Sequence, residues 1–361
     1  MKAQKFKIIA LLIIAQILVI TPTFAGDEEF SKNFHKEYEA NSNTLLKVIN
    51  KFGHIDINNW DKDIVQIDVT VTVDHYDEDK ARELLSYINI QFSHSENTIK
   101  AITEINSKFS KWNSFSFGKN NKEFRIDFKI KMPKDIKLDI SNKYGSVFID
   151  EAKGHSKISV KYGNLKINKL SRENKKPLNE VYLAYSNGEI NTCKWLNTTL
   201  KYSTFRIKEG KAIIAITRYS KLHVETASSI VSDSKYGEYK VGKVGNFVTD
   251  AAYTNFDFDE ITKKIEIEND YGDIKIRHVP SGFEKIDVEN DYGDVDIRID
   301  SEASYQLKGY AKYANIRYPS ESRVNRIKEG SSLKVNGLVG KDKNTKSKVV
   351  IETSYGGVNL H

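Results

Sequence analysis

Hydrophobic and polar residues alternate along most of this chain with a period of two. In "YGDIKIR" (271–277), the two isoleucines fall on one side of an extended strand and the charged residues fall on the other. A second alternating run precedes the tyrosine, for example "KIEIEND" (264–270). A period of two is typical of strands that bury one face. The pattern therefore predicts pairs of short strands separated by a bend at the tyrosine.

The same motif recurs through the chain: an aromatic residue, a small residue and a polar residue, followed by apolar residues at alternate positions. It takes up eleven of the 19 tyrosines, at a spacing of 17 residues from 185 to 253 and of 21 from 271 to 313. The gap from 313 to 355 is 42 residues, and we expect the degenerate "LKVNGLVG" (333–340) to be the missing unit. A Gly, Ser, Thr or Ala follows the aromatic, and glycine there is expected to supply a positive φ. The units begin at Phe52, Tyr144, Tyr162, Tyr185, Tyr202, Tyr219, Tyr236, Tyr253, Tyr271, Tyr292, Tyr313 and Tyr355.

The unit length restricts the fold. Seventeen residues accommodate two short strands and two bends but no helix, and they are too few for a leucine-rich repeat or a propeller blade. An array of antiparallel hairpins is the alternative, although the bends lack the Asn-Gly or Asp-Gly that such hairpins favour. We predict an all-β parallel β-helix, or β-solenoid, with coils of 17–21 residues. The tyrosines would then stack in a column at the interstrand spacing of ~4.8 Å.

About ninety residues between the first two units have a different pattern. Apolar residues at helical spacing predict a short amphipathic helix within 77–90 that uses Ala81, Leu84, Leu85 and Ile88. Strands are predicted at 64–74, 97–105 and 123–133, with a loop at 109–122. We expect a strand-and-helix cap over the first coil, because solenoid ends need covering. The other end, "YGGVNLH", is expected to be an uncapped edge that is short and twisted or that accepts a partner strand.

The first residues have the pattern of a signal peptide. Three lysines precede the apolar run 8–20, and a small-residue site follows, so we expect cleavage after Ala25. The run has 13 residues, fewer than the roughly 20 that span a bilayer. The expected organisation is a signal peptide at 1–25, a first coil with its capping insertion at 26–140, and a solenoid at 141–361. We expect an exported protein, either periplasmic, on the outer surface or secreted, without a transmembrane segment in the mature chain.

Charge and cysteine content exclude some functions. The formal charge is +7, of which three lysines belong to the predicted signal peptide, so the mature chain is mildly basic and no nucleic-acid partner is expected. Cys193 is the only cysteine, so no disulfide can form within the chain. We expect it to be a buried apolar side chain rather than a reactive thiol.

The stretch "NKFGHIDINNWDKDIVQIDVTV" (50–71), followed by many tyrosine units, resembles a family of exported bacterial β-strand-repeat proteins known as putative adhesins, related to the head-GIN type. The resemblance extends over about 44–361 and rests on spacing, without a catalytic signature. It implies a single-stranded right-handed β-helix, an envelope or extracellular location, and a role in adhesion. It transfers no functional residue to this sequence.

Acidic bends are one candidate site. "ENDYGD" occurs at 268–273 and 289–294, and stacking of the coils would place Asp270 beside Asp291 and Asp273 beside Asp294. Stacked like charges repel, and a bound Ca²⁺ would relieve that repulsion. The alternative is a set of solvated carboxylates with Arg277 and Arg298 nearby.

A basic stripe is the second candidate. The residue before the aromatic is basic in five units, and stacking would align these residues as Lys143, Lys161, Lys201, Arg218 and Lys235, with Ala184 interrupting. Such a stripe could hold an acidic polysaccharide; the alternative is solvated side chains that cover the tyrosine rings. A further column of Lys275, Asp296 and Arg317 alternates in sign and predicts weak ion pairing between coils.

Signals for catalysis are weak. The chain lacks HExxH, GxSxG and P-loop motifs. A lyase-like role for Asp270, Asp291 and Arg298 rests only on analogy with other β-helices. The sequence therefore favours a non-enzymatic, adhesin-like envelope protein that binds a cell-surface glycan or an envelope protein. The alternative is a β-helix that binds or cleaves acidic polysaccharide, with Ca²⁺ as the one candidate cofactor. The oligomeric state stays open.

Overall fold

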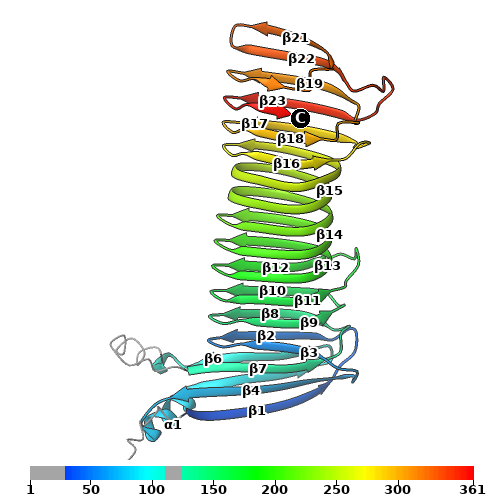
Figure 1. The fold of residues 1–361 in the computed structure, drawn as a ribbon. Coiled ribbons are helices and arrows are strands. Elements are labelled where there is room, and N and C mark those ends of the chain that lie inside the picture. The colour runs from blue at the N-terminus through cyan, green and yellow to red at the C-terminus, as the bar shows by residue number, and fades with distance from the viewer. Residues whose placement is uncertain (1–28, 110–123) are drawn as a thin grey trace, which may run out of the picture.

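A computed structural model describes residues 29–109 and 124–361. The predicted signal peptide (1–25) and nearly all of the predicted loop (109–122) lie outside the described residues. The described chain forms one column of stacked coils, with an antiparallel hairpin at one end and a group of strands with a helix at the other (Figure 1).

The described strands pair as one continuous sheet that folds into two layers, called here the first sheet (before the aromatic residue) and the second sheet (after it). Each coil contributes one strand to each layer, and the chain bends at the aromatic residue between them. Equivalent strands of successive coils pair in parallel and in register, as Lys143 with Lys161 and Val147 with Leu165. Parallel pairing excludes the antiparallel hairpin array, so the β-solenoid prediction is confirmed. Strands before the bend are β2 (Leu45–Lys51), β8 (Lys137–Lys143), β10 (Ser156–Lys161), β12 (Asn179–Ala184), β17 (Lys285–Asp291), β19 (Tyr305–Lys312) and β23 (Lys348–Ser354). Strands after it are β3 (Ile55–Asn59), β9 (Val147–Ala152), β11 (Asn164–Leu170), β16 (Ile274–Val279), β18 (Val295–Ile299), β20 (Ile316–Arg317) and β24 (Val358–Leu360).

In the middle coils the strands continue around the corners that follow each second sheet. These long strands are β13 (Asn187–Lys201), β14 (Thr204–Arg218) and β15 (Lys221–Asp270). The core lies between the two sheets and consists of the expected columns of Ile, Val, Leu and Phe. For example, Ile274 aligns with Val295 and Ile276 with Ile297, and each is at most 1% exposed. Burial of these columns on stacking drives formation of the coils, at ~25 cal/mol per Å² of apolar surface.

The N-terminal end is covered by strands that leave the coil pattern. Strands β1 (Glu29–Glu39), β4 (Ile64–Asp74) and β7 (Phe124–Met132) pair antiparallel, and β7 continues the second sheet beside β3. Strand β5 (Ile88–Ser95) pairs with β6 (Thr98–Ile105), which continues the first sheet beside β2.

The helix α1 (Glu78–Ser86) packs against β4, β1 and β5. It buries Ala81, Leu84 and Leu85, and the Asp77 side chain caps it by accepting a hydrogen bond from the Lys80 amide. The predicted helical set is wrong in one member, since Ile88 begins β5. From Ile88 onward the apolar residues alternate, and that pattern favours a strand.

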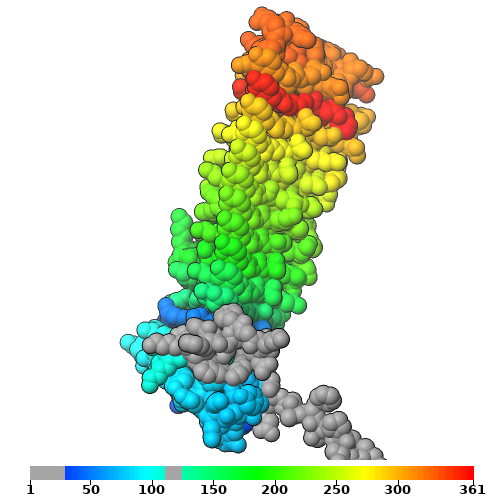
Figure 2. Space-filling view, turned by 90° about the vertical axis from the view of Figure 1, so that its left-hand side faces the viewer, coloured from blue at the N-terminus to red at the C-terminus, as the bar shows by residue number. Residues whose placement is uncertain are grey.

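The C-terminal unit (residues 348–361) departs from chain order. Its strand β23 pairs with β17 on one side and with β19 on the other, and β24 lies between β18 and β20. The chain therefore passes this level of the column, builds the next coil, and returns to fill the gap. Figure 1 marks the C-terminus inside the column, and Figure 2 shows the C-terminal unit as a red band between yellow and orange coils.

Two expectations about this end are wrong. Residues 333–340 are not a missing coil, because β22 (Ser332–Val339) runs antiparallel to β19 and forms a hairpin with β21 (Arg323–Glu329). The C-terminal segment is also not an exposed edge, because it pairs on both sides. The outer edge is β21, where the exposed charges of Arg323, Arg326 and Lys328 disfavour pairing with a further strand. A spacing of 42 residues alone does not distinguish a degenerate coil from a hairpin that carries the chain out and back.

Candidate functional site

The aromatic residues at the bends form a continuous ladder along the column. We use "ladder" for Phe52 and the eleven tyrosines that begin the predicted units. Successive ring centroids are 4.7–5.1 Å apart, and successive ring planes are within 19° of parallel. Tyr355 stacks between Tyr292 and Tyr313, so the ladder follows the column rather than the sequence. The tyrosines are 40–57% exposed, so one edge of every ring is open to a ligand.

The bend itself has a conformation that the sequence did not predict. The aromatic residue takes the positive φ, at 50–65° in all twelve positions. Among the glycines that follow, only Gly53 has a positive φ, of 158°. The later glycines are needed for another reason: a Cβ on Gly163 would lie 2.0 Å from the carbonyl oxygen of Gly145 in the coil below. The expectation that glycine supplies the φ is therefore wrong.

Serine replaces glycine at several middle bends and cross-links the coils. The Ser203 hydroxyl donates to the Lys201 carbonyl at 2.7 Å and accepts from the Ser186 amide at 3.1 Å. The Ser220 hydroxyl accepts from the Ser203 amide at 3.1 Å in the same way. Each bend is thus bonded to the next, which holds successive rings in register.

The predicted basic stripe is brought together by the fold. Lys143 and Lys161 are register partners, as are Lys201 and Arg218, and Arg218 and Lys235. The Lys143 ammonium lies 4.7 Å from the centre of the Tyr144 ring, at a cation–π distance. Arg218 forms an ion pair with Asp233 at 2.8 Å. The four lysines make no ion pair within the described part of the chain, so most of the stripe's charge is available to a ligand.

The four aspartates proposed to bind calcium fall into two separate pairs. Asp270 and Asp291 are register partners on the strand before the bend. Asp273 and Asp294 lie after the bend, and each side chain accepts a hydrogen bond from a backbone amide of the next coil. The Asp294 amide donates to Asp273 at 3.0 Å, and the Gly357 amide donates to Asp294 at 2.8 Å. Over 29–109 and 124–361, no group of three or more His, Cys, Asp and Glu side chains is placed to hold a metal ion. The calcium site stays a prediction.

A column of acidic residues three positions before the tyrosine was missed from the sequence. Glu268, Glu289 and Glu352 are register partners, and Asp250 occupies the same place before Tyr253. Burial, together with the charges of neighbouring carboxylates, raises the pKa of Glu289. Aligning the units on the tyrosine and comparing the third residue before it would have revealed this column. We use "acidic stripe" for these residues and the two adjoining aspartates: Asp250, Glu268, Asp270, Glu289, Asp291 and Glu352.

Exposed apolar residues lie between the two stripes. Ile214, Ile216 and Val231 are 41%, 39% and 46% exposed, and half-buried Val248 continues the row. Ile214 aligns directly with Val231 across β14 and β15. We call these four residues the apolar centre. They precede Tyr219, Tyr236 and Tyr253, near the middle of the ladder.

The second sheet presents a surface of a different kind, because many of its charges pair within the chain. Glu238 accepts from Lys221 and Lys240 at 2.7 and 2.9 Å, and these bonds lower the pKa of Glu238 to about 2. Arg277 pairs with Asp257 and Asp259 and does not accompany the aspartates at the bends. Lys240, Asp257, Asp259 and Arg277 line a groove of about 560 Å³.

The predicted column of alternating charge on this sheet is right for one pair and wrong for the other, because Lys275 and Asp296 are register partners but Asp296 and Arg317 are not. Asn359 of the C-terminal unit lies between Asp296 and Arg317, so these two are not neighbours. Asp296 instead contacts His361 at 2.8 Å. The lyase-like triad is not assembled either, since Asp270 and Asp291 lie before their bends and Arg298 lies in β18 after one.

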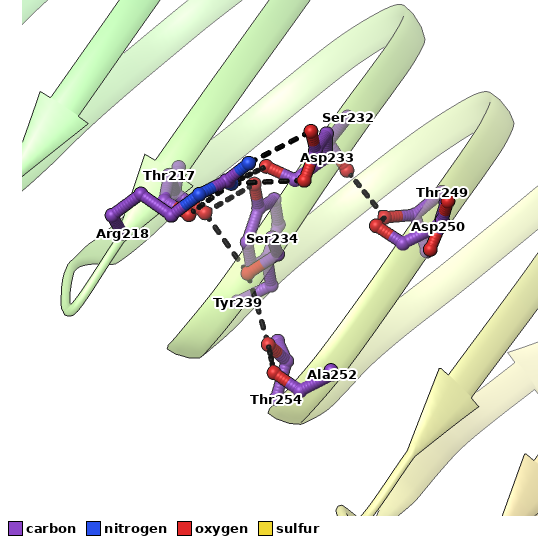
Figure 3. Close-up of polar contacts among 10 residues, drawn as sticks. All are labelled: Thr217, Arg218, Ser232, Asp233, Ser234, Tyr239, Thr249, Asp250, Ala252 and Thr254. Atoms are coloured by element: carbon purple, nitrogen blue, oxygen red, sulfur yellow. Dashed lines mark hydrogen bonds and ion pairs between the residues drawn. The ribbon is translucent and has the colours of Figure 1, made fainter.

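Two further polar groups lie in the interior, the Cys193 thiol and the Tyr239 hydroxyl, and Figure 3 shows the surroundings of Tyr239. Cys193 is 2% exposed, and burial raises the pKa of its thiol to about 12, so the prediction of an unreactive apolar role is confirmed. Tyr239 is fully buried, with its hydroxyl 3.0 Å from that of Thr217, which donates to Ser234 at 2.9 Å. This network satisfies a polar group inside the core, as buried hydroxyls require.

The described residues include no helix long and apolar enough to cross a membrane. Among proteins of curated function, none matches the chain. Three crystal structures are similar at 10–13% identity, and the chain covers 97–99% of each of them over 91–92% of its own length. They are a putative cell adhesion protein from Clostridium sporogenes (TM-score 0.20), and a putative adhesin and a putative lipid binding protein, both from Parabacteroides distasonis (0.40 and 0.29). The model of the Toastrack DUF4097 family matches residues 52–361. The chain belongs to the Toastrack DUF4097 family.

Proposed function

We propose that this Toastrack protein is a non-enzymatic, adhesin-like protein of the cell envelope, and that the ladder and its flanking stripes form its binding surface. The observation that carries the proposal is the unbroken stack of half-exposed rings beside lysines without ion pairs. Aromatic edges and ammonium groups at a regular spacing of ~4.8 Å suit an extended, anionic ligand, because each rung offers the same contacts.

An acidic polysaccharide column tests this surface. The variant Lys161→Glu/Lys201→Glu/Lys235→Glu should elute from heparin or alginate at much lower salt than the native protein, because the unpaired lysines become repulsive. The matched control is Lys166→Glu/Lys275→Glu/Arg298→Glu, which makes the same change in net charge with exposed residues of the second sheet. Equal retention of both variants would contradict a binding role for the ladder side.

A polysaccharide-binding role that depends on Ca²⁺ is the second form of the proposal. The stacked carboxylates of Asp270 and Asp291 support it, since like charges in register favour a bound cation. Calcium titration by calorimetry, and retention on alginate with and without EDTA, test it. Removal of residues 1–25 on export, right-handed winding, and the division at 140/141 are further predictions of the same proposal.

A further inference from the structure

Along the column, the outward residues of the first sheet are mainly basic towards one end and mainly acidic towards the other. "Ladder face" here means the ladder rings together with the residues one, three and five positions before each. The basic stripe occupies this face from Tyr144 to Tyr236, and the acidic stripe occupies it from Tyr253 to Tyr355. Over these ten coils the face is a dipole, with the apolar centre near its midpoint. The last rung, at Tyr313, lies beyond the acidic stripe and carries Lys308 and Lys312.

These charges are not neutralised inside the molecule. The acidic stripe makes no ion pair within the described residues, and in the basic stripe only Arg218 does. The raised pKa of Glu289 reflects its burial and the charges of Glu352 and Glu268 beside it. By contrast, the second sheet pairs Lys208 with Glu189, Lys221 with Glu238, and Arg277 with Asp257. On the ladder face the residues five positions before the aromatic do form ion pairs, as Lys157 does with Glu180 and Glu266 with Lys285. The residues of the two stripes, Arg218 aside, form none within the described residues, and these stacked like charges indicate that the stripes are completed by a partner.

A second copy of the chain has the complementary arrangement. If two ladder faces meet about a two-fold axis perpendicular to the column, the basic stripe of each copy lies opposite the acidic stripe of the other. The apolar centres, with Ile214, Ile216 and Val231 exposed, then meet near the axis. A parallel arrangement would instead place lysines opposite lysines, and the repulsion between like charges disfavours it. The antiparallel arrangement is a closed, isologous interface of the kind that most homodimers use.

The dimensions of the face suit such an interface. With strands ~4.8 Å apart and ~3.3 Å per residue, ten coils by five residues measure about 43 by 17 Å, or about 700 Å². A stable interface buries ~800 Å² on each partner, with an apolar core and a charged rim.

We propose that the ladder face binds the ladder face of a second copy in antiparallel orientation. The inference rests on the proposed function, in which this face is a binding surface, and it names the partner. Homotypic pairing of this kind would supply adhesion between two molecules of the same protein.

Charge reversal with complementation tests the proposal by analytical ultracentrifugation. The native protein should be a dimer that high salt weakens. Variant one, Lys161→Glu/Lys201→Glu/Lys235→Glu, places acidic side chains in both halves of the face, and variant two, Glu268→Lys/Glu289→Lys/Asp291→Lys, places basic side chains in both halves. Each alone should dimerise at least about a hundredfold more weakly than the native protein, because like charges now oppose each other. An equimolar mixture should form a heterodimer.

The control Lys166→Glu/Lys275→Glu/Arg298→Glu should dimerise like the native protein, and circular dichroism should show all variants folded. A monomeric native protein, or a mixture of the two variants that stays monomeric, overturns the inference. So does association that neither reversal affects, as end-to-end contact through β21 would give. A monomer that still needs Lys161, Lys201 and Lys235 for retention on heparin overturns only the inference, whereas a dimer without such retention overturns the polysaccharide ligand.

Discussion

At the scale of the residue, the ladder tyrosines combine an unfavourable backbone with a favourable stack. A non-glycine residue in the left-handed region costs roughly 1–2 kcal/mol, and every ladder position has such a φ. A stacked aromatic pair contributes about 0.5–1.5 kcal/mol beyond its buried area, and each inner ring has two such neighbours. The stack therefore holds the bend in a conformation that the residue alone would avoid.

Substitutions of Tyr219 allow the backbone strain and the ring stacking to be measured separately. Its φ is 53°, and its ring is stacked at 4.9 Å on Tyr202 and at 4.8 Å on Tyr236. Tyr219→Ala loses the ring and keeps the strain, whereas Tyr219→Gly loses the ring and relieves the strain. We expect the alanine variant to be less stable than the glycine variant by about 1 kcal/mol, measured by urea denaturation. The opposite order would show that the bend is not strained.

The position of each tyrosine could be predicted from the sequence, but its φ could not. Glycine adopts positive φ more readily than any other residue, so the Tyr-Gly pair led to the prediction of a positive φ at the glycine instead of at the tyrosine. The deciding contact is the approach of Gly163 to the backbone of Gly145, which involves residues of two coils. No pattern within one unit contains that information.

At the scale of the element, the bends are of two kinds. Glycine bends bring successive backbones so close that a Cβ has no room, as at Gly163 and Gly293. Serine and threonine bends leave that room and use the hydroxyl to bond the neighbouring coil, as at Ser203 and Ser220. Gly237 lies among bends of the second kind, between Ser220 and Thr254 in the stack.

Two glycine substitutions compare these bends. A Cβ on Gly163 would lie 2.0 Å from a backbone oxygen, whereas a Cβ on Gly237 would lie 2.8 Å from the Ser234 side-chain oxygen and 3.1 Å from the Ser220 backbone oxygen. We expect Gly163→Ala to cost about 3 kcal/mol and Gly237→Ala less than about 1 kcal/mol of unfolding free energy. Thermal denaturation of both variants measures the difference. Equal losses would mean that bend glycines serve flexibility rather than close approach.

Of the elements of the candidate site, the basic stripe was predicted from the sequence and the acidic stripe was not. The basic stripe could be predicted because register alone aligns residues at one position of the unit. The acidic stripe needed a comparison at the third residue before each tyrosine, and its place beside the exposed Ile216 and Val231 needed the order of the coils. Asp296 and Arg317 were paired wrongly for the same reason, since Asn359 comes from a unit much later in the chain.

At the scale of the whole molecule, the C-terminal unit connects the column to its end cap. Val349, Ile351, Val358 and Leu360 are at most 2% exposed and fill the core between the coil of β17 and the coil of β19. Burial of each such side chain contributes about 1.5–3 kcal/mol. The hairpin of β21 and β22 pairs with the column through β19, which itself pairs with β23, and Arg326 of β21 also donates hydrogen bonds to Asn315 and Ile316.

Deletion of residues 344–361 tests this dependence. We expect residues 305–339 to lose their protection against amide hydrogen exchange and proteolysis, because β19 loses its parallel partner. The coils from β8 to β17 should keep their protection, since each stacks on the coil below. His361→Ala, which changes only the last side chain, serves as the control. Unchanged protection of 305–339 in the deletion variant would show that β19 can pair directly with β17.

The return of the C-terminal unit also fixes when the protein can finish folding. Most coils can stack as soon as they leave the ribosome, because each follows its neighbour in the chain. The coil at 305–317 cannot, since the level beneath it is occupied by residues that are made later. Assembly of the far end therefore waits for the last residues to emerge, and a chain interrupted before residue 348 exposes an open strand edge to the cell's proteases.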